Sequence, residues 1–309
     1  MHKYRLLTDA TRFLFRNKKK PVVIFIRIIQ YVKRDVFLRP FISLWVKLSQ
    51  SLFHLAKFQP ISFEPEGVFI HANNNLFYCY DTELEGGLAG MEYGGLWESQ
   101  ELALILENTP INGTVLDIGA CFGSFTFPLA NEKHAYVHAF EPGKKAFSLL
   151  TKNYQKNNLP GITLINSAVG DKMGTVRLSM IDYMGNYIVS KNKLENTDSA
   201  PMMTVDLYVR QKKLKSVDSI KCDVEGSEYS VLQGAKKTIE TFSPVVLVEI
   251  HDELLDRQNA SADKIFDFFE IRGYTYRRIT EDNEVKTPLA DHAAELSQGH
   301  NFFFYKSKK

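Results

Sequence analysis

One stretch, residues 114–125 (TVLDIGACFGSF), constrains the fold more than any other. It begins with an apolar strand pattern and runs directly into a loop that holds Gly119 and Gly123, after which a helical pattern starts. A second strand pattern, 135–140, follows and ends at Glu141. A strand, a glycine turn, a helix and a strand ending in an acid form the layout of a nucleotide-binding βαβ unit.

The glycine spacing indicates which nucleotide to expect. The dinucleotide fingerprint G-x-G-x-x-G fails, because Cys121 and Ser124 stand where its second and third glycines would be. An acid, Asp117, precedes Gly119, and it would repel a pyrophosphate but suit a cation. S-adenosylmethionine carries a sulfonium, an ammonium and a ribose, and Glu141 can accept the ribose hydroxyls. Electrostatics therefore favour S-adenosylmethionine over NAD, with a βα turn that binds no ligand as the alternative.

The charges are unevenly distributed, although the net charge of the whole chain is only +2. Residues 1–60 hold 13 lysines and arginines and 2 acids, whereas residues 61–309 hold 25 and 34. Residues 1–58 also show three amphipathic helical patterns. A basic helical appendage of this kind suits a membrane surface, and a cap on the domain or on a second subunit is the equal alternative. We expect residues 61–309 to form the main domain.

Cysteine usage and hydropathy indicate the compartment. The three cysteines, Cys79, Cys121 and Cys222, form no C-x-x-C pair, which favours a reducing compartment over a disulfide or zinc framework. No apolar run approaches the length of a spanning helix, and no signal-peptide pattern is present. We expect a cytoplasmic protein, with peripheral placement at the inner face of the membrane left open.

The remaining chain alternates between strand and helix patterns. Residues 60–65 read as a linker, 67–71 and 76–80 as strands, and 81–95 as a loop facing the site. Residues 182–201 read as a long loop that covers the site or recognises a substrate. Around these segments, six or seven strands alternate with helices, which predicts an α/β fold with a doubly wound, mostly parallel sheet. The strands are expected at 115–118, 135–140, 162–167, 219–224, 244–250, 274–279 and 301–305, with a short extra strand at 175–180.

A cluster of charges follows the strand at 219–224. In a doubly wound sheet this strand lies beside the strand at 115–118, so its end faces the glycine loop. Strand alternation places Lys221, Asp223 and Glu225 on one side, where ionisable groups are costly unless they have partners or a function.

Several blocks together resemble the FkbM-type methyltransferases. The similarity covers about residues 110–255, outside which the first 60 residues fall. It implies a Rossmann-like class I methyltransferase fold, S-adenosylmethionine as cofactor and O-methylation of hydroxyls on sugars, glycolipids or natural products. The blocks are residues 115–124 (VLDIGACFGS), 140–142 (FEP), 166–171 (NSAVGD), 205–207 (VDL), 220–228 (IKCDVEGSE), 231–235 (VLQGA) and 248–251 (VEIH).

The resemblance also implies roles for individual residues. Gly119, Ala120 and Gly123 would line the methionine end of the cofactor, with Asp117 facing its ammonium. Glu141 would hold the ribose, and Ser167 and Ala168 would lie beside the adenine. At the methyl-transfer centre the resemblance implies the two acids of the charged cluster, Asp223 and Glu225.

The residues themselves leave the general base open among Asp223, Glu225, Lys221 and His251. Lys221 is alternatively an ion-pair partner of one of the acids. A divalent metal held by Asp223 and Glu225 is also left open, because two carboxylates alone are weak evidence.

The function expected from these observations is O-methylation of a small-molecule or glycan acceptor. The alternative from a different class is a non-catalytic Rossmann-like module in a membrane-surface or glycan-assembly complex. Nucleic acid is not expected as a partner because no base-binding module is visible, and oligomerisation is left open. Asp206 receives no role.

Overall fold

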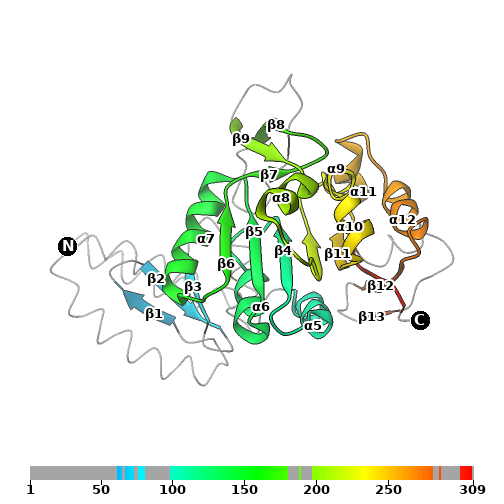
Figure 1. Cartoon of the computed structure of the whole chain (residues 1–309). Coiled ribbons are helices and arrows are strands. Elements are labelled where there is room, and N and C mark those ends of the chain that lie inside the picture. The colour runs from blue at the N-terminus through cyan, green and yellow to red at the C-terminus, as the bar shows by residue number, and fades with distance from the viewer. Residues whose placement is uncertain are drawn as a thin grey trace, which may run out of the picture. The chain divides into compact units, whose positions relative to one another are not determined.

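The computed structural model describes residues 61–64, 67–72, 76–80, 98–179, 188, 197–280, 285–286 and 300–307, which belong to two compact units (Figure 1). The helices expected within 1–58 and the loop expected at 81–95 lie outside the described residues. The division of the chain at residue 60 therefore stays a prediction.

The smaller unit contains a three-stranded sheet in the order β1-β2-β3. The strands predicted at 67–71 and 76–80 are confirmed as β2 (Gly67–His71) and β3 (Phe77–Tyr80). The linker predicted at 60–65 is wrong, because Ile61–Glu64 form strand β1. Its backbone pairs antiparallel with β2, with Ile61 opposite Ile70, so ladder hydrogen bonds satisfy groups that a linker would leave to water.

The larger unit is built on an eight-stranded sheet in the order β13-β12-β14-β11-β10-β4-β5-β6. The five strands from β11 to β6 are parallel, whereas β14 runs antiparallel to both β11 and β12. This confirms the doubly wound, mostly parallel sheet. The bounds are β4 Thr114–Ile118, β5 Tyr136–Phe140, β6 Ile162–Ile165, β10 Ser219–Cys222, β11 Val245–Glu249, β12 Thr275–Ile279, β13 Val285–Lys286 and β14 Asn301–Tyr305.

Helices cover both faces of this sheet, as right-handed crossovers in two directions require (Figure 1). One face carries α5 (Ser99–Asn108), α6 (Thr126–Lys133) and α7 (Lys144–Asn157), and α5 contacts β11 and β14. The main apolar core fills the other face, beneath α8 (Val205–Lys212), α9 (Glu228–Gly234), α10 (Lys236–Phe242) and α12 (Ala262–Glu270). A short helix, α11 (Asp252–Asp256), follows β11.

A small second sheet interrupts the alternation after β6. It consists of β7 (Ala168–Val169), β8 (Gly174–Ser179) and β9 (Thr197–Met203). The extra strand predicted at 175–180 is confirmed as β8. The loop predicted at 182–201 is wrong over its last five residues, because they pair antiparallel with β8 as part of β9. Most of the remainder of that loop lies outside the described residues.

Candidate active site at the carboxyl ends of the strands

The glycine loop after β4 packs tightly against the chain itself. Gly119 has φ +83°, and a Cβ built there would lie 1.8 Å from the carbonyl oxygen of Asp223. Gly123 has φ +96°, and its Cβ would meet the Phe127 ring at 2.2 Å. The backbone N–H groups of Gly119 and the buried Ala120 both donate to the carbonyl of Phe140 at 3.0 Å. The loop is thus fixed over β4, β5 and β10, as the predicted adjacency of β4 and β10 requires.

Asp117 is fully buried beneath this loop. Its Oδ2 accepts a hydrogen bond from the Thr126 hydroxyl at 2.5 Å, whereas its Oδ1 has no hydrogen-bond partner among the described residues. Burial raises the pKa of Asp117, and the nearby Lys221 ammonium opposes that rise. An unpartnered buried carboxylate oxygen of this kind suits a cationic or hydrogen-bond-donating ligand.

Glu141 follows β5 and lies across the loop from Asp117. Its Oε2 accepts from the N–H of Cys121 at 3.0 Å and its Oε1 from the N–H of Gly143 at 2.7 Å. Burial raises the pKa of Glu141 to about 7, although these two N–H groups favour the charged form. A carboxylate has about four acceptor positions, so each oxygen can still accept from a ligand hydroxyl.

Ser167 and Ala168 follow β6 and are both buried. The Ser167 hydroxyl lies 2.9 Å from the carbonyl oxygens of both Ala168 and Pro201, so it joins β7 to β9. The two residues therefore occupy the predicted place at the end of the third parallel strand.

Lys221 of β10 is an ion-pair partner. Its Nζ donates to the carbonyl oxygen of Gly119 at 2.8 Å and to Asp223 Oδ2 at 3.1 Å. Burial alone would lower the pKa of Lys221, but the carboxylates of Asp223, Asp117 and Glu98 outweigh it and raise that pKa above its usual value. The ammonium therefore keeps its proton at neutral pH, which favours the partner alternative over the base alternative for this lysine.

The turn after β10 is held by an acid of α9. Glu225 at φ 54° and Gly226 at φ +99° reverse the chain. Glu228 Oε1 accepts from the N–H groups of Val224 (3.0 Å) and Gly226 (3.1 Å). Burial raises the pKa of Glu228 to about 7. This acid thus shapes the loop that presents Asp223 and Glu225.

His251 follows β11 and stacks on His300, with ring centroids 4.6 Å apart and an interplanar angle of 22°. The Nδ1 atoms of both rings are buried without a hydrogen-bond partner in the part of the chain that the structure describes. Within those same residues, no group of three or more His, Cys, Asp and Glu side chains could hold a metal ion. The metal at Asp223 and Glu225 accordingly stays a prediction.

The strand register brings five polar side chains onto one face of the sheet. Lys221 lies opposite Asp117, and Glu249 lies opposite Asn301. Because Cys222 pairs with Val248, the next residues of those two parallel strands, Asp223 and Glu249, are also neighbours. We call these five residues the polar row.

The amino end of α5 adds two acids that the sequence did not indicate. Glu101 is buried and accepts from the Asn301 amide at 2.9 Å. Glu98 precedes α5 at φ 54°, and burial followed by the charge of Asp223 raises the pKa of Glu98 to about 8. Glu249 was also missed, although it is the acid that ends an apolar strand beside β10.

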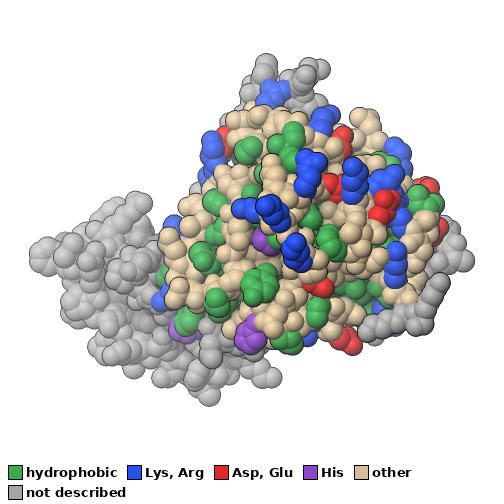
Figure 2. Space-filling model, viewed as in Figure 1, with side chains coloured by type: hydrophobic (Ala, Val, Ile, Leu, Met, Phe, Trp, Pro, Cys, Tyr) green, Lys and Arg blue, Asp and Glu red, His purple; other side chains and the backbone are tan. Residues whose placement is uncertain are grey.

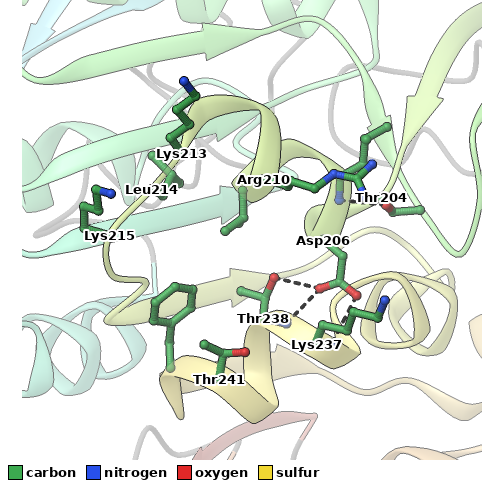
Figure 3. Close-up of a pocket in the computed structure, with 12 residues that line it drawn as sticks. Thr204, Asp206, Arg210, Lys213, Leu214, Lys215, Lys237, Thr238 and Thr241 are labelled. Carbon is green, nitrogen blue, oxygen red and sulfur yellow. Dashed lines mark hydrogen bonds between the residues drawn. The ribbon is translucent and has the colours of Figure 1, made fainter.

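A cavity of about 490 Å³ lies elsewhere, between α8 and α10 (Figure 3). Its lining residues Lys215 and Phe242 shortly precede β10 and β11, at the strand ends opposite the glycine loop. Asp206, which had no predicted role, caps α10 by accepting from the N–H groups of Lys237 (3.1 Å) and Thr238 (2.8 Å).

Lysines and arginines gather on the surface over α8 and α10 (Figure 2). In the close-up, Lys213 and Lys215 lie at one end of the cavity and Arg210 and Lys237 at the other, so these cations do not converge on one point (Figure 3). The cavity is therefore not part of the candidate site.

Curated relatives and one solved structure are similar to parts of this chain. Hexuronic acid methyltransferase AglP of Haloferax volcanii is 26% identical over 157 residues, which are 50% of this chain and 62% of that protein. Methyltransferase 1 of Beauveria bassiana is 27% identical over 165 residues, which are 46% of this chain and 66% of that protein. The chain thus spans just under two thirds of the length of these two relatives.

The crystal structure of Methyltransferase FkbM from Methylobacillus flagellatus KT has 20% identity and a TM-score of 0.42, and the match covers 63% of this chain and 44% of that one. A TM-score this low carries no functional argument. Within the described residues, no helix combines the length and the hydropathy needed to cross a membrane.

A sequence profile described as "Methyltransferase FkbM domain" matches residues 117–276, a little more than half of the chain. The match begins at Asp117 and includes Glu141, the turn after β10 and Glu249. The chain therefore belongs to the FkbM methyltransferase family.

Proposed function

We propose that this methyltransferase binds S-adenosylmethionine at the glycine loop and transfers its methyl group to a hydroxyl of a sugar, a glycolipid or a related natural product. The observation that carries the proposal is the pair of acids at the ends of β4 and β5. Asp117 has a buried oxygen without a partner, and Glu141 retains acceptor capacity. When bound, the cofactor supplies a methyl group on a sulfonium.

The residues present fit this cofactor. The Asp117 Oδ1 atom would accept from the ammonium, directly or through water, and Glu141 would accept from the ribose hydroxyls. The absence of a basic residue at positions 119–125 agrees with a ligand that has no phosphate. The proposed cofactor-binding residues besides the two acids are Gly119, Ala120, Gly123, Ser167 and Ala168.

The acceptor wall would be formed by the end of β10 and the adjoining turns. The Asp223 side chain is 26% exposed and that of Lys221 only 6%, so Asp223 is the member of this pair that an acceptor could reach. We propose that Asp223 aligns the acceptor hydroxyl and receives its proton, with Glu225 and His251 as the other candidates. The sugar class is supported by the relative named hexuronic acid methyltransferase.

A binding experiment tests the cofactor assignment. Glu141→Gln removes one acceptor oxygen and Glu141→Ala removes both, so we expect the affinity for S-adenosylhomocysteine in calorimetry to fall about 10- to 100-fold in the alanine variant. Because the Glu141 pKa is about 7, the wild-type affinity should also fall as the pH is lowered through 7, and Glu141→Gln should remove that dependence. The exposed Glu107→Ala is the control. Equal affinities in all variants, at unchanged melting temperature, would contradict the assignment.

The same experiment separates the non-catalytic alternative, which predicts no binding of S-adenosylhomocysteine by the wild-type chain. Peripheral membrane contact through residues 1–60 is a separate proposal, supported by the 13 basic residues in that segment. Flotation with anionic vesicles at low salt tests it, and a chain that stays with the protein fraction would reject it.

A further inference from the structure

Glu249 is placed by the sheet to act on Asp223. It ends β11, and the parallel ladder that pairs Cys222 with Val248 makes Asp223 and Glu249 the next neighbours across the two strands. Side chains alternate along strands, so both carboxyl groups point to the face that carries Lys221. The proximity therefore follows from the register of the central strands.

The two carboxyl groups are in direct contact, because the Glu249 side chain is hydrogen-bonded to that of Asp223. Two ionised carboxylates have only acceptors, so this contact requires a proton between them. The charge of Asp223, then burial, and then the acids Glu225 and Glu98 raise the pKa of Glu249 to about 10. Glu249 therefore holds the proton at neutral pH and donates to Asp223.

Asp223 is held from its other side by Lys221, which donates to Oδ2 at 3.1 Å and to the Gly119 carbonyl at 2.8 Å. The backbone oxygen of Asp223 is also packed against the Cα of Gly119. The carboxylate is thus fixed between a cation and a neutral acid while its side chain stays 26% exposed.

We propose that Glu249 is a positioning residue for methyl transfer: its protonated carboxyl group donates to Asp223 and fixes that carboxylate to receive the proton of the acceptor hydroxyl. The inference rests on the proposed function. As the acceptor oxygen bonds to the methyl carbon, the carbon–sulfur bond breaks and its electron pair stays on sulfur. The hydroxyl proton passes to Asp223, and Glu249 keeps its own.

The charged groups around Glu249 come from several elements. Asp223 and Lys221 belong to β10, Glu225 to the turn after it and Glu98 to the start of α5. The rings of His251 and His300 follow and precede the ends of β11 and β14. The ammonium of Lys221 is engaged by the Gly119 carbonyl and Asp223, so protonation is the remaining way for these acids to lower their mutual repulsion.

Carbon-13 NMR of the full chain labelled at the Glu carboxyl carbons tests the proton. We expect one Glu signal to titrate above pH 9 in the wild type and in Glu107→Gln, and to be absent in Glu249→Gln. Ionisation of every Glu carboxyl below pH 9 would overturn the proposal. So would loss of the protonated signal at pH 8 on adding millimolar Mg²⁺, since the pair would then be a metal site.

Labelling at the Asp carboxyl carbons tests positioning, with the Asp223 signal identified by Asp223→Asn. Glu249→Gln keeps a donor, so the Asp223 titration should stay near its wild-type position, whereas Glu249→Ala should shift it by more than about one pH unit. Equal shifts in both variants would overturn the positioning role and leave only packing. Neither measurement uses cofactor or acceptor, so its failure is distinct from failure of the cofactor-binding test.

Discussion

Replacing Gly119 by alanine tests whether the glycine loop and the end of β10 form one unit. The position combines two constraints: φ is +83°, and the added Cβ would lie 1.8 Å from the Asp223 carbonyl oxygen. Two other glycines separate these effects. Gly273 has φ +73° and open space around its Cβ, whereas Gly174 has open space and no positive φ.

The magnitudes follow from these environments. A left-handed conformation costs a non-glycine residue about 1–2 kcal/mol, which is the loss of unfolding free energy expected for Gly273→Ala. Gly119→Ala adds a collision with backbone that no side-chain rotation relieves, and such overpacking costs a further ~1–3 kcal/mol. We therefore expect Gly119→Ala to lose about 2–5 kcal/mol in total. Gly174→Ala should stay within about 1 kcal/mol of the wild type.

Urea unfolding gives these free energies by linear extrapolation. Calorimetry with S-adenosylhomocysteine on the folded variants should show an affinity loss for Gly119→Ala and none for Gly273→Ala. If Gly119→Ala and Gly273→Ala lose the same stability within about 0.5 kcal/mol, the end of β10 gives way to the methyl group. That result would refute the claim that the two loops are locked together.

Two further predictions concern the helix face of the sheet. Asp206→Ala removes the cap of α10 and should lower the unfolding free energy by about 1–2 kcal/mol in urea, against no change for the exposed Asp267→Ala; a loss equal to the control would show that the cap is dispensable. Burial, then the charge of Lys212, lowers the pKa of His138 to about 4, so the unfolded chain binds this proton more readily and stability falls as the pH drops from 6.5 to 4. His138→Phe should reduce that acid-induced loss by about 2 kcal/mol, allowing for partial solvent screening, and parallel pH dependences in both proteins would contradict the assignment.

The sequence predicted those parts of the site that follow one another along the chain. Asp117, the glycine loop and Glu141 belong to one βαβ unit, so their spacing alone indicates a shared strand end. The charged end of β10 was predicted from topology, and its pairing with β4 confirms the adjacency. The fold class followed from the alternation of strand and helix patterns.

The missed parts depend on packing between distant segments. Glu98 and Glu101 reach the site only because α5 lies across β11 and β14, a contact for which the helix pattern carries no signal. Glu249 ends its own strand, but its role depends on the register against β10. The strand β1 was missed because prolines at 60 and 65 flank a run of only four residues.

The polar row has a consequence for how such a site can change in evolution. Its members neutralise one another across four strands, from Asp117 on β4 to Asn301 on β14. Loss of one partner leaves a buried charge uncompensated, which costs about 3–5 kcal/mol. Neutral drift through single substitutions is therefore closed to the row. Its residues are expected to covary among homologues, and a library that randomises neighbouring members together should yield folded variants that no one-residue scan contains.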